Sequence, residues 1–297
     1  MEESDSVSHA TAVADSHSIR IPAPSATGRS LCEREDRMTE TEFQIVKSIG
    51  FVLAFALAVA IQRFRPHRTL AGSWQTNSQL WALNALVLGV ACAGCACTVS
   101  RWATDAGLGL LNQDVMLAGL AIPISVLGMD LVSYLWHRAN HQLRFLWRFH
   151  QAHHSDPDFT VTTALRFHPG ELLLALPVRL LAVIILGVPI AGVIVFEVIF
   201  AFANFCVHGN IDLTEKIERL LGGVLITPAL HRRHHGRESR LLDTNYGTIF
   251  SFWDRLFGSY GESRSDVRID TGLPGLESAL GAMEILTLPA RGTFRGR

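Results

Sequence analysis

His150-Gln-Ala-His153-His154 is the stretch that decides the character of this chain, because a near-copy of it follows later as His231-Arg-Arg-His234-His235. A third element, His137-Arg-Ala-Asn-His141, stands just upstream of the first copy. Residues at positions i, i+3 and i+4 share one side of a helix, and neutral imidazole is the commonest side-chain metal ligand. The spacing therefore predicts helices that aim their histidines into a metal-binding cavity.

Long apolar segments flank these histidines and predict a membrane protein. Of the 297 residues, 48% are hydrophobic, and the formal net charge of −1 lacks the basic excess of a nucleic-acid-binding protein. A helix that crosses a bilayer needs about 20 predominantly apolar residues. Segments of this kind are 43–62, 80–99, 115–135 and 172–207, the last of which divides at Gly187-Val-Pro189. We expect an all-α, polytopic membrane bundle of four or five spans.

Cationic residues indicate the orientation of this bundle. Arg63, Arg65 and Arg68 directly follow the first apolar segment, and an excess of arginine marks the cytoplasmic end of a span. Counting the spans onward puts residues 137–166 and 208–235 on that same side. We therefore expect a histidine-rich helical cap on the cytoplasmic face of a multi-pass protein, whose compact size favours a bacterial inner membrane.

The N-terminal stretch 1–37 lacks the apolar core of a secretory signal peptide. It is rich in Ser, Ala, Asp and Glu, which predicts disorder. Met38 stands just before the first apolar segment and is a second candidate for the start of translation.

The number and surroundings of the histidines favour a pair of redox-active ions. Nine candidates exceed the four to six ligands that one ion takes. No cysteine lies near the clusters, which argues against a structural zinc site, and no carboxylate lies within them, which argues against a hydrolytic two-metal site. Imidazole suits iron, which we choose. The nine candidate ligands are His137, His141, His150, His153, His154, His208, His231, His234 and His235.

Cysteine usage predicts no disulfide. The count of five is odd, and Cys92, Cys95 and Cys97 all lie within the second apolar segment. Cysteine in such surroundings is typical of a small packing residue. We therefore interpret Cys92-Ala-Gly-Cys95 as packing rather than as a redox pair or a thiol metal site.

Together these motifs resemble those of the fatty acid hydroxylase / sterol desaturase superfamily, with HxxxH, HxxHH and HxxHH on a multi-span chain. Arg166-Phe-His168-Pro169-Gly-Glu171 is similar to the RxHPxE segment of that family, and His208-Gly-Asn210 to its isolated histidine. Asn245-Tyr246-Gly247 and Trp253-Asp-Arg-Leu-Phe-Gly258 resemble the end of its domain. The resemblance covers a catalytic domain (115–260). Composition and hydropathy divide the rest of the chain into a disordered polar tail (1–42), N-terminal transmembrane helices (43–114) and a C-terminal tail (261–297).

The resemblance implies a membrane-bound di-iron oxygenase of lipid biosynthesis, which hydroxylates or desaturates a sterol, a fatty acyl chain or a related lipid with O2. Two iron ions held by the nine histidines are the implied cofactors. No GxGxxG motif follows a strand pattern, so we expect electrons from a separate ferredoxin or cytochrome with its reductase. The alternatives are a membrane protein that binds or transports metal without oxygenase activity, and a haem-binding membrane cytochrome.

Four polar residues near the motifs have two interpretations each. A metal-bound imidazole usually donates its other N–H to a carboxylate or carbonyl, so His168, Glu171, Asp130 and Asn245 are candidates to bind metal or to orient a ligand. For Asp130 the other interpretation is helix packing, and for His168 it is the binding of a helix end. Asn245 is also typical of a turn.

Two charged residues, Arg179 and Glu197, lie within the last apolar segment. A charged side chain there is costly unless it has a partner or lines a cavity. We expect the two either to line a substrate cavity or to pair with each other.

Overall fold

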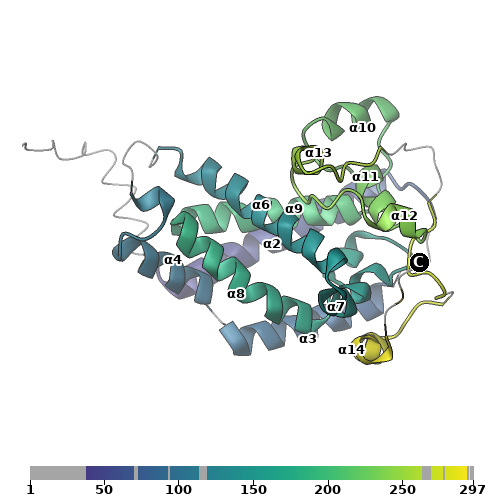
Figure 1. The fold of residues 1–297 in the computed structure, drawn as a ribbon, viewed down its shortest axis with the longest axis horizontal. Coiled ribbons are helices and arrows are strands. Elements are labelled where there is room, and N and C mark those ends of the chain that lie inside the picture. Colours follow the sequence, from purple (N-terminus) through teal and green to yellow (C-terminus); the bar gives the residue numbers. More distant parts are fainter. Residues whose placement is uncertain are drawn as a thin grey trace, which may run out of the picture. The chain divides into compact units, whose positions relative to one another are not determined.

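The structure is a computed structural model, which describes residues 38–69, 73–92, 94–113, 119–262, 269–276, 278–292 and 294. Within these residues the regular structure is helical, with isolated β-bridges and no strand (Figure 1). The stretch 1–37, predicted to be disordered, lies outside the described residues. The helices are α2 (Glu40–Phe64), α3 (Trp74–Cys92), α4 (Cys95–Asp105), η1 (Leu110–Asn112), α6 (Ala121–Gln142), α7 (Arg144–His154), η2 (Val161–Leu165), α8 (Pro169–Leu186), α9 (Ile190–His208), α10 (Glu215–Gly222), α11 (Pro228–His234), α12 (Ser239–Leu242), α13 (Phe252–Leu256) and α14 (Ala282–Arg291).

The ends of several helices follow local sequence signals. α2 begins after Thr39, whose hydroxyl accepts from the N–H of Glu42 while the Glu42 carboxylate accepts from the N–H of Thr39. α8 and α11 begin at Pro169 and Pro228, a residue that suits the first helical position because an N–H there has no helical partner. α8 ends at Leu186 and is followed by Gly187, which adopts a φ of 68°.

Four helical segments in the described part of the chain are long and apolar enough to cross a membrane. They are α2, α8, α9 and the run Trp74–Asn112, which begins with α3. The all-α membrane bundle predicted from the sequence is confirmed. The predicted span 115–135 is described only from residue 119, where α6 covers most of it. α6 is not one of the four membrane-spanning candidates, because Asp130 and the polar residues after His137 lower its mean hydropathy.

The core of the bundle lies between α6, α8 and α9. Val126 and Met129 of α6 are buried with Val183 of α8 and Phe196 of α9 in one cluster. A second cluster joins α2 to α9 around the buried ring of Phe205. These contacts hold the helices side by side and so fix where their ends lie.

The histidine-bearing ends of the helices meet at one end of the bundle. Pro66, just after α2, forms a β-bridge with Ile211, just after α9. At the start of α3, the Asn77 amide donates to Asp156 Oδ2 (2.9 Å), just after α7. Figure 1 shows α7, α11 and α12 at this end, on the right of the view.

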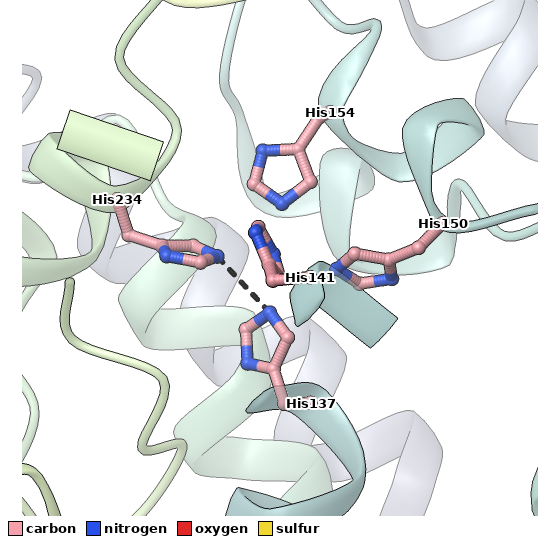
Figure 2. A group of neighbouring side chains, drawn as sticks. All are labelled: His137, His141, His150, His154 and His234. Atoms are coloured by element: carbon pink, nitrogen blue, oxygen red, sulfur yellow. Dashed lines mark hydrogen bonds between the residues drawn. The ribbon is translucent and has the colours of Figure 1, made fainter. Parts of the chain in front are cut away.

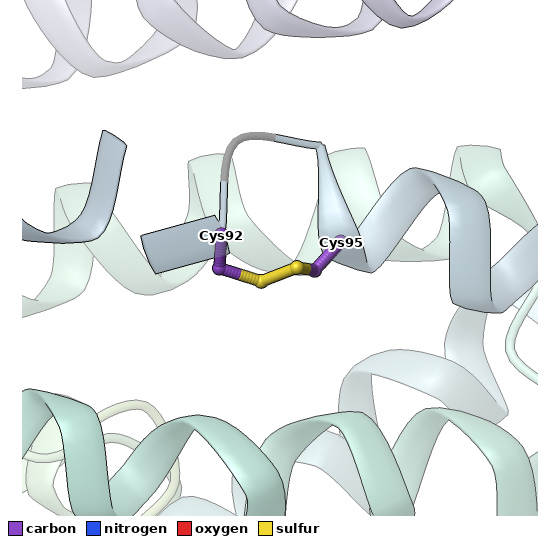
Figure 3. The surroundings of a disulfide bond; sticks show 2 residues. All are labelled: Cys92 and Cys95. Atoms are coloured by element: carbon purple, nitrogen blue, oxygen red, sulfur yellow. A yellow bond between two sulfur atoms is a disulfide. The ribbon is translucent and has the colours of Figure 1, made fainter. Parts of the chain in front are cut away.

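Between α3 and α4 the structure contains a disulfide bond, which corrects the sequence interpretation. Cys92 ends α3, Cys95 begins α4, and their sulfur atoms are bonded (Figure 3). The helix breaks here, with Gly94 at a φ of 78°, and the two Cα atoms lie 5.3 Å apart, within the range that a disulfide spans. The prediction of packing cysteines was wrong for this pair, because it treated the second apolar segment as one unbroken helix.

The C-terminal stretch is a second correction. We expected residues 261–297 to form a surface tail, but α14 packs on the bundle. Ile285 and Leu288, on one side of α14, are buried with Leu80 of α3 and Ala152 of α7. The helix is short and amphipathic and lies among polar and glycine-rich residues, so composition alone predicted a tail.

Asp130 fastens the segment after α12 to α6. Its buried carboxylate accepts hydrogen bonds from the backbone N–H groups of Ile249 (3.3 Å) and Phe250 (3.2 Å) and from Trp253 Nε1 (3.0 Å). A buried carboxylate with three donors is a strong long-range link. Asp130 thus joins α6 of the bundle to the 249–253 segment, which follows the second HxxHH motif in the chain.

We predict that Asp130→Ala lowers the free energy of unfolding by about 3 kcal/mol, because it leaves buried donors without an acceptor. Chemical unfolding in detergent micelles, followed by far-ultraviolet circular dichroism, measures the effect. Asp130→Asn keeps one side-chain oxygen as an acceptor and should lose less. Equal unfolding midpoints for the wild type and Asp130→Ala would contradict this role.

Candidate metal centre

The histidine motifs lie on four elements whose ends converge. His137 and His141 occupy the last turns of α6, α7 carries the first HxxHH, His208 ends α9, and α11 with its C-cap residue carries the second HxxHH. The structure brings together all nine histidines named from the sequence, in two groups. The first group is His137, His141, His150, His154 and His234, and the second is His153, His208, His231 and His235.

Within each group, one ring nitrogen of every member lies within 4.8 Å of those of the other members. Figure 2 shows the first group, in which imidazoles from α6, α7 and α11 point toward a common centre. The two groups adjoin, because the rings of His154 and His235 stack with their centroids 4.2 Å apart. Every member is buried except His137, which is half-buried. Each group could hold a metal ion.

Each HxxHH motif supplies both groups, which the sequence interpretation did not foresee. In the first motif His150 and His154 enter the first group, and His153 enters the second. In the second motif His234 enters the first group, and His231 and His235 enter the second. A helix turns by roughly 100° per residue, so residues at i and i+4 stay close while the residue at i+3 points elsewhere. One motif can therefore contribute histidines to two groups, and each group receives histidines from both motifs.

Five imidazoles are fixed through Nδ1 by groups that only accept hydrogen bonds. A carbonyl or carboxylate requires the hydrogen to be on Nδ1, and Nε2 then keeps its lone pair. This tautomer, with an acceptor behind it, is the one that metal-bound histidines use. The five bonds run from His137 to the Tyr246 carbonyl (2.7 Å), His234 to Thr244 (2.7 Å), His208 to Asn204 (2.7 Å), His153 to Arg166 (3.3 Å) and His150 to Glu171 Oε1 (2.8 Å).

The Nε2 atoms face one another at distances that suit a shared cation. His208 Nε2 lies 2.9 Å from the Nε2 atoms of both His153 and His231, and His234 Nε2 lies 3.0 Å from His137 Nε2. In the His208–His153 and His234–His137 contacts the Nδ1 bonds leave both Nε2 atoms with lone pairs. Facing lone pairs repel each other, so these two contacts are unfavourable without a cation between them. Two nitrogens bound at right angles to one ion, each at about 2.0–2.1 Å, would lie roughly 3 Å apart. The residues present therefore fit metal coordination.

Further ring nitrogens are buried with no hydrogen-bond partner among the described residues. They are both nitrogens of His154 and of His235, Nε2 of His150 and Nδ1 of His231. A buried nitrogen without a partner costs about 1–3 kcal/mol. Their concentration in two small volumes indicates that a group which accepts lone pairs belongs there.

Burial keeps these imidazoles neutral. Removal from water disfavours the charged form and holds the pKa values of His153, His154, His231 and His235 well below their ordinary range, and repulsion between neighbouring histidines adds to this. The same causes lower the pKa of His234 to about 3. Neutral imidazole is the form that binds metal.

Two residues of the segment around the start of α8 support the histidine helices. The Glu171 carboxylate is buried and accepts from His150 Nδ1 and from Asn140 Nδ2 (3.1 Å). Arg166, also buried, donates from Nε to the Ala152 carbonyl (3.1 Å) near the C-terminal end of α7, where a cation is favourable. Glu171 was a candidate from the sequence. The part played by Arg166 was missed, although it begins the RxHPxE stretch.

Asn245 shapes the turn that holds two of the imidazoles. Its φ of 56° lies in the left-handed region, where asparagine is one of the few side chains that occur. Its amide donates to the carbonyls of Leu230 (3.1 Å) and Gly261 (2.9 Å). The carbonyls directly before and after it accept from His234 and His137. Asn245 thus acts on the site through the backbone, as a turn residue.

The other two candidates lie apart from both histidine groups. His168 Nδ1 accepts from the N–H of Gly170 (2.9 Å) and caps α8. A capping side chain turns back onto its own helix end, which removes this ring from the site. Asp130, two helical turns before His137, binds the segment 249–253 instead of a histidine. His168 thus binds a helix end, the second interpretation that the sequence offered, whereas Asp130 serves as a hydrogen-bond acceptor for a distant segment.

An apolar pocket of about 160 Å³ lies against both histidine groups. Its polar wall contains histidines of each group, and its apolar wall is built by α6, α8 and the segment between α7 and α8. The histidines that line it are His137, His150, His153, His208 and His231, and the apolar lining includes Val132, Trp136, Phe167, Leu172, Ala175 and Val178.

Residues 122–259, which contain all nine histidines, match the model of the fatty acid hydroxylase family. This region belongs to the fatty acid hydroxylase family. The family resemblance drawn from the motifs is confirmed.

Curated relatives of this fatty acid hydroxylase region are named as lipid oxygenases. The chain is 33% identical over 165 residues to an alkylglycerol monooxygenase of Danio rerio, which covers 54% of this chain and 34% of the relative. It is 30% identical over 154 residues to the ornithine lipid hydroxylase OlsE of Rhizobium tropici, and this match covers 50% of the present chain and 45% of the relative. The alkylglycerol monooxygenase of Homo sapiens is 34% identical over 137 residues, and this match covers 45% of the present chain and 29% of the relative. The chain thus spans less than half the length of these relatives. No solved structure matches it.

We predict that Glu171→Ala weakens metal binding by this fatty acid hydroxylase domain about 10–100-fold, because His150 loses the acceptor that orients it. Elemental analysis after dialysis against graded chelator measures the affinity. Glu215→Ala is the matched control, since it removes an exposed carboxylate of α10 that forms an ion pair with Arg219. Equal metal retention by the two variants would contradict the role of Glu171.

We also predict that the chelated protein loses stability as the pH falls from about 7 to about 5. The unfolded histidines take up protons near pH 6.5, whereas the folded ones have lowered pKa values, down to about 3 for His234. Unfolding is therefore favoured below pH 6.5, by up to about 1.4 kcal/mol per pH unit for each such histidine. Thermal melting in detergent at the two pH values measures this. Unchanged melting would show that the rings are not neutral in the fold.

Proposed function

We propose that this chain is a di-iron lipid hydroxylase, with one iron bound by each histidine group and O2 as co-substrate. The observation that carries the proposal is the pair of inward-facing imidazole groups beside an apolar pocket. Five and four nitrogen ligands suit two ions of octahedral preference, and imidazole suits iron. Family membership and the names of the relatives favour oxygenation of a lipid, and both names favour hydroxylation over desaturation.

The residues of the chain bind and position the reacting groups. Iron, when bound, supplies the activation of O2 that an unactivated C–H bond needs. Trp136, Phe167 and Leu172 hold the hydrocarbon against the histidine wall and keep bulk water away from it. Glu171 and the backbone carbonyls hold the imidazoles in their binding tautomer, so little rearrangement accompanies metal binding.

The reaction needs an outside source of electrons. Conversion of C–H to C–OH with O2 consumes two electrons and two protons and releases water. The sequence contains no dinucleotide-binding motif after a strand pattern. We therefore assign the electrons to a ferredoxin or a cytochrome with its reductase, and the activity to lipid biosynthesis.

We assign the histidine end of the bundle to the cytoplasmic side of a bacterial inner membrane. Arg63 and Arg65 stand where α2 ends, and Pro66 joins this end to Ile211, close to the second histidine group. Arginines in short loops mark the cytoplasmic side.

Metal transport, the alternative, has less support. A transport path needs ligands spread along the spans, whereas in the described residues the grouped histidines gather at one end and are almost all buried. Axial haem ligation has less support too, because it uses one or two histidines and not groups of five and four.

The test is the lipid mass profile of cells that produce the chain. We predict that one or more lipids gain the mass of one oxygen atom, and that His153→Ala and His234→Ala, one from each group, both abolish the gain. His168→Asn is the matched control, because it removes a histidine outside both groups and keeps a residue that caps helices well. It should retain activity.

Loss of two hydrogen atoms, in place of the gain, would assign desaturation. A folded, metal-loaded protein that changes no lipid mass and consumes no O2 when supplied with electrons would contradict the oxygenase. Metal uptake by vesicles in that case would favour transport.

A further inference from the structure

Arg179 lies within the apolar helix α8 with no carboxylate beside it in the described structure. Glu197, the partner considered from the sequence, instead pairs with Lys47 of α2, with Oε2 and Nζ 3.1 Å apart. The Arg179 guanidinium lies over the rings of Phe196 (5.7 Å) and Phe200 (5.5 Å), both on α9. Its charge is therefore directed into the bundle, where a cation is costly without a counter-charge.

Arg179 stands at the boundary of two cavities. The pocket beside the histidines measures about 160 Å³. A larger cavity of about 790 Å³ lies among α2, α3, α8 and α9, with apolar residues such as Trp81 and Leu176 in its lining. Arg179, Phe200 and Asn204 line both cavities, so the two adjoin at the guanidinium.

Two helices give the same distance between this cation and the histidine groups. Arg179 follows Glu171, the partner of His150, by eight residues on α8, and Phe200 precedes His208 by eight residues on α9. Eight residues of helix span roughly 12 Å. The cation therefore lies about 12 Å into the bundle, measured from the histidines.

The volumes decide how an elongated ligand would lie. Ligand pockets commonly measure roughly 300–1,000 Å³, and of these two cavities the larger one reaches that range. A long hydrocarbon chain thus fits in the larger cavity, and only a short segment fits between Arg179 and the histidines.

We propose that Arg179 binds the phosphate or carboxylate of an anionic lipid, whose long chain occupies the larger cavity. The identification of this lipid as the substrate rests on the proposed function. The guanidinium offers a planar set of donors that matches such anions, and the anion supplies the missing counter-charge. The carbon that is oxygenated then lies on the short segment beyond the anion, within roughly 12 Å of it, and not along the long chain.

The test measures binding to the purified full-length protein without O2, so that it does not depend on turnover. The probes are lysophosphatidylglycerol and monoacylglycerol with the same chain, brominated at its middle, and the readout is bromine quenching of tryptophan fluorescence. We expect the anionic probe to bind about tenfold more tightly than the neutral one. Quenching should come mainly from Trp81 in the larger cavity, and should fall in Trp81→Phe.

Arg179→Gln should weaken binding of the anionic probe alone, so that the two probes bind within about twofold of each other. Arg179→Lys should keep part of the preference for the anionic probe. Arg63→Gln removes an exposed arginine outside both cavities and should keep all of it. Equal binding of the two probes to the wild type, or an unchanged preference in Arg179→Gln, would overturn the proposal.

Two further arms separate the possible sources of error. Displacement of the lipid by inorganic phosphate at matched concentration would assign the site to a free anion and overturn the lipid assignment. Binding that depends on Arg179, in a metal-loaded protein that oxygenates no lipid, would refute the proposed hydroxylase and leave the anion site standing.

Discussion

Nine imidazoles are turned inward at one end of this bundle with almost all of their surface buried, and the surrounding structure is built to hold them there. Burial alone would favour ring orientations in which each nitrogen lone pair accepts a hydrogen bond from a nearby donor. Acceptors behind Nδ1 prevent this for five of the rings and leave their Nε2 lone pairs facing one another. These facing lone pairs make the metal-free fold less stable and favour the binding of a cation between them.

The acceptors come from four different parts of the chain, and this explains the helical framework. Two carbonyls flank Asn245, one belongs to Asn204 of α9, one to Arg166, and the carboxylate to Glu171 of α8. Each would move if its element shifted. Asp130 therefore matters to the site without touching a histidine, because it fixes the 249–253 segment that follows the turn at Asn245.

The features that the sequence predicted well depend on helix periodicity alone. Apolar runs predicted the membrane bundle, and the HxxxH and HxxHH spacings named all the histidines that the fold collects except His208, which stands alone in the sequence. Their division into two groups depends on how α7 and α11 are rotated against each other, which no local pattern encodes. His168 and Asp130 stand near the motifs in sequence, but a helix cap and a long-range hydrogen-bond set decided their positions. The Cys92–Cys95 bond depended on a helix break, and the burial of α14 on contacts with distant helices.

The cavities beside the histidines are lined largely by the long helices of the bundle. The histidine pocket opens onto a larger cavity between spans, with Arg179, Phe200 and Asn204 common to both. Asn204 also accepts from His208 Nδ1, so a residue that lines the cavities orients a histidine of the second group. The lining of both cavities and the orientation of this histidine thus depend on the same helical surface.

The most direct test of the account is the metal stoichiometry of the folded, purified chain, determined by elemental analysis. The account predicts two iron ions per chain in the wild type, and a loss centred on one ion when a single group is disrupted, as in His235→Ala. Folded protein that retains fewer than one transition-metal ion per chain after reconstitution with iron would contradict it.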